Sequence, residues 1–222
     1  MEKLAVIFDM DGVIAHTNPY HTEAFRQFFD KYKVSYTELE FEDHMYGKHN
    51  SYIMNYFFKR EIKGDEFKRL EDEKEALFRE IYQHIMKPIA GFLEFLAALK
   101  NSGFHTGVAT SAPRANLDLI MDGLGFAAQM ESVLASEDVQ AHKPNPEIYL
   151  KSADNLGVSP INCVVFEDSY SGVSAAINAG TKVIGVLSSH TKDQLPPCQY
   201  YIRNYHDVDI AIVKRILALP HA

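Results

Sequence analysis

Four short, mostly apolar runs recur along the chain. They cover residues 4–8, 106–110, 163–166 and 183–187. Each run is rich in β-branched residues and lacks a strict alternation of polar and apolar positions. This pattern is typical of strands that are buried on both faces of a parallel sheet.

Helical patterns lie between these runs. In two stretches, 92–99 and 117–124, apolar residues recur at i, i+3, i+4 and i+7, and Gly103 follows the first of them as a stop signal. A further helix is expected at 173–179. Because strands alternate with helices, the sequence predicts an α/β fold with a doubly wound parallel sheet.

The stretch 14–86 has a different character, because it lacks a β-branched run and shows four successive amphipathic patterns. They predict helices at about 20–32, 37–46, 52–60 and 65–85. One helix is enough to connect two parallel strands, so four helices indicate an inserted helical cap domain. We therefore expect an α/β core formed by 1–13 and 87–222, with the cap 14–86 as a candidate lid over the carboxyl edge of the sheet, where such folds bind ligands.

Composition and charge narrow the function classes. The net charge is −8, and no run of lysine and arginine forms a basic stripe, so we expect no nucleic-acid partner. The apolar run 4–8 is too short for a signal peptide or a membrane span, so a cytoplasmic location without membrane attachment is expected. Cys163 and Cys198 cannot form a disulfide framework, and Cys163 is expected to be a buried core thiol. The oligomeric state is left open, and a monomer is compatible with the sequence.

Two carboxylates, Asp9 and Asp11, follow the first predicted strand, and Gly12 lets the chain turn behind them. Two like charges this close favour a divalent cation between them, and carboxylate oxygens suit Mg²⁺. A carboxylate at a strand end can also attack phosphorus. Asp9 is then the nucleophile, and Asp11 transfers the proton, first as acid and then as base. Taken alone, the pair also fits a surface turn.

Two further segments supply a hydroxyl and a cation. Thr110 and Ser111 end the second strand just before a helix that opens at Pro113, where a hydroxyl and backbone N–H groups can hold a phosphate. A helix N-cap is the commoner use of such residues. Lys143 precedes the first of two prolines, which keep the backbone non-helical. It could offset charge on the nucleophile and the phosphoryl oxygens, or it could be a solvated surface lysine.

Glu167 and Asp168 follow the strand 163–166 as directly as Asp9 follows its own strand. They could complete a magnesium site, or they could form an acidic cap at the start of the next helix. Taken together, the four segments supply a nucleophile, a phosphate-binding hydroxyl, a cation and metal ligands. This is the set that one phosphoryl-transfer reaction needs.

With these motifs in this order, the chain resembles the haloacid dehalogenase superfamily, in particular its β-phosphoglucomutase-like branch with a helical cap. The resemblance covers nearly the whole chain and rests on Asp9-Met10-Asp11-Gly12, Thr110, Lys143 and Glu167-Asp168. It implies that Asp9 is phosphorylated during catalysis and that Asp11 is the acid/base. It further implies that Asp9, the backbone carbonyl of Asp11 and Asp168 bind Mg²⁺. Glu167 would be a ligand or lie one step further out.

Departures from the family pattern concern the substrate. His16 stands where the family commonly has an aspartate, and Asn50 stands where the sugar phosphomutase has an arginine that grips the non-reacting phosphate. Lys48 or His49 could partly replace that arginine, but neither offers its planar two-point grip. The expected substrate-binding residues are His21, Gly47, Lys48, His49, Asn50, Ser111, Ala112 and Arg114, with Arg114 as the single cation after the second strand.

These departures favour hydrolysis over isomerisation, because a mutase must retain a bisphosphate intermediate. The sequence therefore predicts a Mg²⁺-dependent phosphatase that acts on a small phosphorylated metabolite such as a sugar phosphate. A sugar phosphomutase and an inorganic pyrophosphatase remain alternatives. A binding protein without turnover is disfavoured, because it would need neither the nucleophile Asp9 nor the proton carrier Asp11.

Overall fold

The computed structural model describes residues 2–45 and 49–220, and it divides into two compact units. The core unit comprises Met1–His16 and Met86–Ala222, and the helical unit comprises Thr17–Ile85. The sequence placed the boundaries at 13/14 and 86/87. The difference arises because Ile14 accepts a backbone hydrogen bond from Ile89 (2.8 Å) and Ala15 bridges Pro88, which keeps 14–16 in the core unit.

The core unit is built on a parallel sheet with the strand order β3-β2-β1-β4-β5-β6. The strands are β1 (Ala5–Phe8), β2 (His105–Ala109), β3 (Ser132–Leu134), β4 (Cys163–Glu167), β5 (Lys182–Val186) and β6 (Tyr200–Ile202). The predicted doubly wound α/β fold is confirmed, and the four predicted strands agree with β1, β2, β4 and β5 to within one residue. The edge strands β3 and β6 were not predicted, because three residues show no usable pattern.

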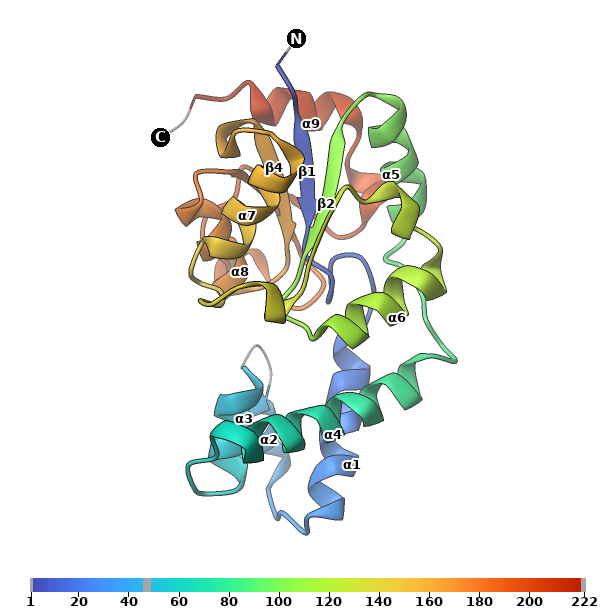
Figure 1. Cartoon of the computed structure of the whole chain (residues 1–222). Helices are drawn as coiled ribbons and strands as arrows, with labels where there is room; N and C mark the ends of the chain where they lie inside the picture. Colours follow the sequence, from blue (N-terminus) through green and yellow to red (C-terminus); the bar gives the residue numbers. More distant parts are fainter. Residues whose placement is uncertain (1, 46–48, 221–222) are drawn as a thin grey trace. The chain divides into compact units, whose positions relative to one another are not determined.

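Helices cover both faces of this sheet (Figure 1). They are α5 (Phe92–Asn101), α6 (Arg114–Leu124), α7 (Glu147–Leu156), α8 (Tyr170–Asn178) and α9 (Ile210–Leu217). The short 3₁₀ turns are η1 (Ala127–Gln129), η2 (Ser136–Asp138), η3 (Pro160–Asn162), η4 (Lys192–Gln194) and η5 (Tyr205–Asp207). The predicted glycine stop is present, since Gly103 adopts a positive φ of 79° just after α5.

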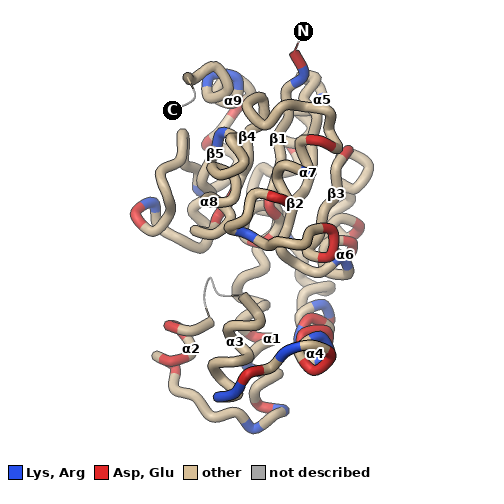
Figure 2. Tube along the Cα trace, turned by 60° about the vertical axis from the view of Figure 1, so that its left-hand side comes forward, with Lys and Arg blue, Asp and Glu red and all other residues tan. Residues whose placement is uncertain are grey.

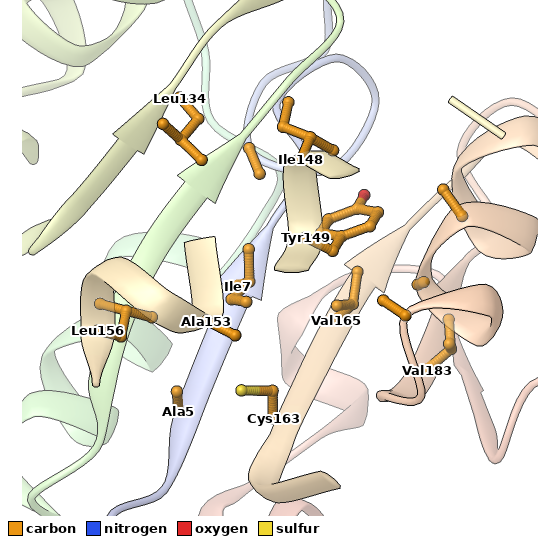
Figure 3. Packing of buried hydrophobic residues seen from close by; sticks show 14 of the residues in the cluster. Ala5, Ile7, Leu134, Ile148, Tyr149, Ala153, Leu156, Cys163, Val165 and Val183 are labelled. Atoms are coloured by element: carbon orange, nitrogen blue, oxygen red, sulfur yellow. The ribbon is translucent and has the colours of Figure 1, made fainter. Parts of the chain in front are cut away.

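Burial on both faces explains why the strands read as apolar runs. On one face Ala5 and Ile7 of β1 pack with residues of α7 and α8, and Figure 3 shows Cys163 and Val165 of β4 in the same cluster. On the other face, Phe8 stacks on Phe166 at 5.1 Å between ring centroids and meets an aromatic layer from α5 and η5. The Cys163 thiol is buried as expected, and burial raises its pKa to about 12.

In the residues of the helical unit that the structure describes, 17–45 and 49–85, the helices are α1 (Asn18–Lys31), α2 (Glu38–Met45), α3 (Asn50–Phe57) and α4 (Gly64–Tyr82). They match the four helices expected from the sequence. Aromatic side chains fill the interior of this unit, where Phe29 is fully buried and contacts Phe57 at 4.8 Å between centroids. Figure 2 shows that α4 carries both acidic and basic residues. Among the described residues, no helix is both long enough and apolar enough to cross a membrane.

We predict that Ile7→Ala lowers the free energy of unfolding by about 2–5 kcal/mol, because Ile7 is fully buried and truncation leaves a cavity in the sheet core. Ile161→Ala, at a side chain that is 49% exposed, should change it by less than about 0.5 kcal/mol. Urea denaturation followed by circular dichroism measures both. Equal losses in the two variants would contradict the core assignment.

Candidate active site

The carboxyl ends of β1, β2 and β4 lie side by side at the centre of the sheet. Phe8 is level with Val108 of β2 and with Phe166 of β4, so Asp9 leaves β1 at the level where Glu167 ends β4. The backbone N–H of Asp9 still donates to the carbonyl of Phe166 at 3.0 Å. This placement at a topological switch point is where open α/β sheets bind ligands.

Lys143 joins the ends of three strands. From the segment before α7, its Nζ donates to Asp9 Oδ1 (2.7 Å), Glu167 Oε1 (2.8 Å) and the carbonyl of Ala109 (3.1 Å). The lysine side chain is only 4% exposed. Although burial lowers the pKa of Lys143, Asp9 and Glu167 raise it well above its ordinary value, so the ammonium group stays charged. The interpretation of Lys143 as a solvated surface lysine is therefore wrong.

Glu167 is held through both of its carboxylate oxygens. Oε1 accepts from Lys143 and from the Tyr149 hydroxyl (3.0 Å), and Oε2 accepts from the backbone N–H (2.9 Å) and the hydroxyl (3.0 Å) of Ser169. The absence of a side chain at Gly172 makes room for this carboxylate, because a Cβ there would lie 1.6 Å from Oε1. Glu167 is thus fixed between α7 and the start of α8.

Asp168, the next residue, is 5% exposed and points to the loop after β5. The hydroxyls of Ser188 (3.2 Å) and Ser189 donate to its Oδ2, and the ring Nδ1 of His190 lies 2.9 Å from its backbone carbonyl. Burial, with the charge of Glu167, raises the pKa of Asp168 to about 7, while the two serine hydroxyls act in the opposite direction.

Negative charge exceeds positive charge at this edge of the sheet. Burial, with the charges of Glu167, Asp168 and Asp11, raises the pKa of Asp9 well above its ordinary value, although Lys143 lowers it. A divalent cation held by oxygen ligands would offset this excess, so the donor set fits Mg²⁺. Within 2–45 and 49–220, no three acidic, histidine or cysteine side chains form a metal cage by themselves. A site built from two carboxylates and a backbone carbonyl, as the resemblance implies, requires no such trio.

The second strand ends at Ala109, within one residue of the predicted end, and the first turn of the helix that follows already contacts a carboxylate of the protein. Thr110 is 1% exposed, and its Oγ1 accepts from the Ala112 N–H at 3.1 Å. The N–H of Arg114, at the first turn of α6, donates to both carboxylate oxygens of Glu137 at 3.0 Å. This N–H is therefore not open to a phosphate. The phosphate cradle predicted at Thr110 and Ser111 would use only groups before the helix, and it stays a prediction.

The guanidinium of Arg114 is engaged within the core unit. It forms an ion pair with Asp138 and donates to the carbonyl of Val133 at 3.2 Å. The single cation expected after the second strand is thus paired with a carboxylate of the protein. A part for Arg114 in substrate binding stays a prediction.

The cap residues expected to bind substrate lie in the helical unit. Asn50 begins α3, and its Nδ2 donates to Glu71 (3.0 Å) and Glu75 (2.8 Å) on α4. His21 stacks on Phe78 with 3.7 Å between ring centroids, and its Nδ1 accepts from Lys74 at 3.2 Å.

His49 caps α3, since its Nδ1 accepts from the N–H of Ser51 at 3.4 Å. Gly47 and Lys48 lie outside the described residues. His16, in the core unit, is exposed, and its N–H donates to the carbonyl of Lys87 at 3.3 Å.

Sequence reasoning missed Tyr149 and the triplet Ser188, Ser189 and His190. Tyr149 carries no motif, and only the packing of α7 brings its hydroxyl to Glu167. The triplet follows the predicted strand 183–187 directly. The rule that selected Asp9 and Glu167, polar residues at the carboxyl end of a buried strand, applies equally to it.

Known proteins share both this sequence pattern and this fold. The family model for haloacid dehalogenase-like hydrolases matches residues 6–186. A relative from Thermotoga maritima, named phosphorylated carbohydrates phosphatase, is 35% identical over 189 residues, which cover 83% of this chain and 86% of that protein. The resemblance predicted from the four motifs is confirmed.

Solved structures show the same architecture. An Entamoeba histolytica HAD hydrolase of family IA, variant 3, has a TM-score of 0.91 at 26% identity and covers 99% of this chain and 100% of that one. A β-phosphoglucomutase from Clostridium difficile has a TM-score of 0.82 at 22% identity, covering 97% of each chain. The second likeness shows a common fold.

We predict that Lys143→Met lowers the free energy of unfolding by about 3–5 kcal/mol at about pH 8, because it leaves two buried carboxylates without their cation. When the pKa of a carboxyl is higher in the folded than in the unfolded protein, the free energy of unfolding falls as the pH rises above the pKa of the unfolded state. Removing the lysine increases that rise for Asp9. The loss should therefore be smaller at about pH 5 than at about pH 8.

Denaturation at both pH values tests this, with Lys214→Met, at an exposed lysine of α9, as the control. The control should change stability by less than about 0.5 kcal/mol. A loss in Lys143→Met that does not depend on pH would contradict the charge balance described for Asp9.

Proposed function

This chain belongs to the haloacid dehalogenase-like hydrolases and is a phosphoric monoester hydrolase, and we propose that it hydrolyses a small phosphorylated carbohydrate through an aspartyl-phosphate intermediate. The observation that carries the proposal is the buried contact between Lys143 Nζ and Asp9 Oδ1 at 2.7 Å. It presents a carboxylate at a strand end beside a fixed cation. Phosphoryl transfer needs chiefly such positioning and charge compensation.

In the first half-reaction, a carboxylate oxygen of Asp9 attacks phosphorus, and the bond from phosphorus to the sugar oxygen breaks. Asp11 donates a proton to that oxygen, so the sugar leaves as a neutral alcohol. Gly12, with a φ of 73°, forms the turn that follows Asp11, and its N–H donates to the carbonyl of Ala15 at 2.8 Å. Lys143 offsets the charge that accumulates on the phosphoryl oxygens.

In the second half-reaction, the Asp11 carboxylate takes a proton from water as the water oxygen attacks phosphorus. The bond from phosphorus to Asp9 breaks, inorganic phosphate is released, and Asp9 returns as a carboxylate. Asp11 is protonated again, so the two half-reactions balance. Thr110 lies at the end of the neighbouring strand β2 and is proposed to hold a phosphoryl oxygen through its hydroxyl.

We assign Mg²⁺ to the carboxylates of Asp9 and Asp168 and the backbone carbonyl of Asp11. When bound, Mg²⁺ supplies charge compensation for the phosphoryl group. Glu167, tied to Lys143, Tyr149 and Ser169, acts by holding the ammonium group of Lys143 in place.

A phosphatase is preferred to a phosphomutase because two of the residues expected to bind substrate, Asn50 and Arg114, are engaged within the protein. Asn50 donates to Glu71 and Glu75, two acidic groups that would repel a phosphate. Arg114 is neutralised by Asp138. The T. maritima relative is likewise named as a phosphatase of phosphorylated carbohydrates. The helical unit is proposed to act as a cap that selects the substrate.

A substrate panel distinguishes the candidate activities. Phosphate release should be assayed with sugar monophosphates, sugar bisphosphates and pyrophosphate, each with Mg²⁺ and again with a chelator. The proposal expects monophosphate hydrolysis that disappears with the chelator and returns with added Mg²⁺. Interconversion of sugar phosphate isomers without net phosphate release would favour a mutase, and preference for pyrophosphate would favour a pyrophosphatase.

We predict that Asp9→Asn reduces kcat at least about 10³-fold, because the amide cannot form the acyl phosphate, while the circular dichroism spectrum is unchanged. Asp193→Asn, in the turn η4, is a matched control and should keep its kcat. Denatured acid-trapped protein from the wild type, incubated with ³²P-labelled substrate, should carry label, and Asp9→Asn should not. Near-normal turnover in Asp9→Asn would rule out the covalent mechanism.

A further inference from the structure

The loop that follows β5 contacts one residue of the candidate metal site from three consecutive positions. Ser188 and Ser189 reach the carboxylate of Asp168, and His190 reaches its backbone carbonyl. The hydroxyls of Ser188 and Ser189 are also 3.4 Å apart. The start of this loop is already fixed by its backbone, because the N–H of Leu187 donates to the carbonyl of Ile202 at 2.7 Å. Three adjacent side chains directed at a single aspartate are therefore more than the loop needs to hold its place.

The two serine hydroxyls converge on the same oxygen, Oδ2 of Asp168. Two donors on one oxygen fix the rotation of a carboxylate, since turning the group would break both bonds. His190 acts on the backbone in a similar way. A carbonyl can only accept, so Nδ1 carries the proton and donates it at 2.9 Å. The side chain and main chain of Asp168 are thereby both held from β5.

The donors at Asp168 differ in kind from those at Asp9 and Glu167. Asp9 and Glu167 share the ammonium group of Lys143, a full positive charge. The serine hydroxyls stabilise the Asp168 carboxylate without adding positive charge beside it. A neutral donor leaves the attraction of the carboxylate for a cation intact, whereas a second ammonium group would repel that cation.

We propose that Ser188, Ser189 and His190 are positioning residues that hold Asp168 in the orientation in which it binds a divalent cation. The inference rests on the proposed use of Mg²⁺ at Asp168. It adds the end of a fourth strand, β5, to the site formed by the ends of β1, β2 and β4. Hydrogen-bonding partners of metal ligands typically contribute roughly 10–100-fold to metal affinity.

The test is calorimetric titration of the metal-free protein with Mg²⁺, which reads binding without turnover. The double variant Ser188→Ala/Ser189→Ala should raise the Kd for Mg²⁺ at least about 10-fold. At saturating Mg²⁺ its kcat should stay within about twofold of the wild type, because Asp168 is restored to its place by the bound cation. His190→Ala should also raise the Kd, by a smaller factor.

Two variants separate positioning from a general loss of structure. Ser189→Thr retains the hydroxyl and adds a methyl group, and it should keep the wild-type affinity for Mg²⁺. If affinity depended on the shape of the side chain rather than on its hydroxyl, this variant would lose it. Ser174→Ala removes a serine hydroxyl that donates to the carbonyl of Tyr170 at 2.8 Å on α8, and it should leave the Kd unchanged. The melting temperature of each metal-free variant identifies any variant that fails to fold. If the double variant fails to fold, Ser188→Ala and Ser189→Ala are tested singly.

An unchanged or lower Kd in the double variant overturns the inference, because the hydroxyls would then be structural or would compete with the cation. A wild type that binds no Mg²⁺, or Asp168→Asn that binds it like the wild type, overturns it as well. These results are distinguishable from failure of the proposed function. That function is judged by phosphate release from the substrate panel and by labelling of Asp9.

Discussion

The ion pairs of the Lys143 ammonium group with Asp9 and Glu167 are the interactions on which the rest of the site depends. The lysine side chain is 4% exposed, and its Nζ lies within 2.8 Å of the two carboxylates, one at the end of β1 and one at the end of β4. A buried carboxylate without a partner is costly, so this cation stabilises both Asp9 and Glu167 at the ends of their strands. Tyr149, Ser169 and the space left by Gly172 then hold Glu167, which keeps the lysine in place.

Charge is distributed unevenly around this lysine, and the imbalance directs the chemistry. Lys143 neutralises part of the charge of Asp9 and Glu167, while Asp11 and Asp168 add more negative charge nearby. The resulting excess suits a divalent cation, and a cation together with an ammonium group suits a phosphoryl group. A site of this kind attracts its anionic substrate locally, although the protein as a whole carries a net charge of −8.

Two of the residues expected to bind substrate are held by contacts outside the candidate catalytic group. The Arg114 guanidinium is neutralised by Asp138, and Asn50 is engaged by two glutamates of α4. Both side chains were expected to contact substrate, and each is engaged by acidic residues of its own unit. The fold alone does not specify the substrate, because function depends on the particular residues that the fold carries.

The sequence by itself determined the buried strands, the helical insertion and the residues at the strand ends. These features are local, because an apolar run, a helical period or a motif such as Asp9-Met10-Asp11-Gly12 can be recognised without knowing which residues contact it in the fold. The edge strands β3 and β6 were not predicted, because a run of three residues shows no pattern of its own and is a strand only through its pairing with a neighbour. The tertiary structure decided the partners. Lys143 contacts Asp9 across 134 positions of the chain. Glu137 accepts a hydrogen bond from the N–H of Arg114 at the start of α6, and Ser188 donates to Asp168. Each of these contacts depends on how distant segments pack.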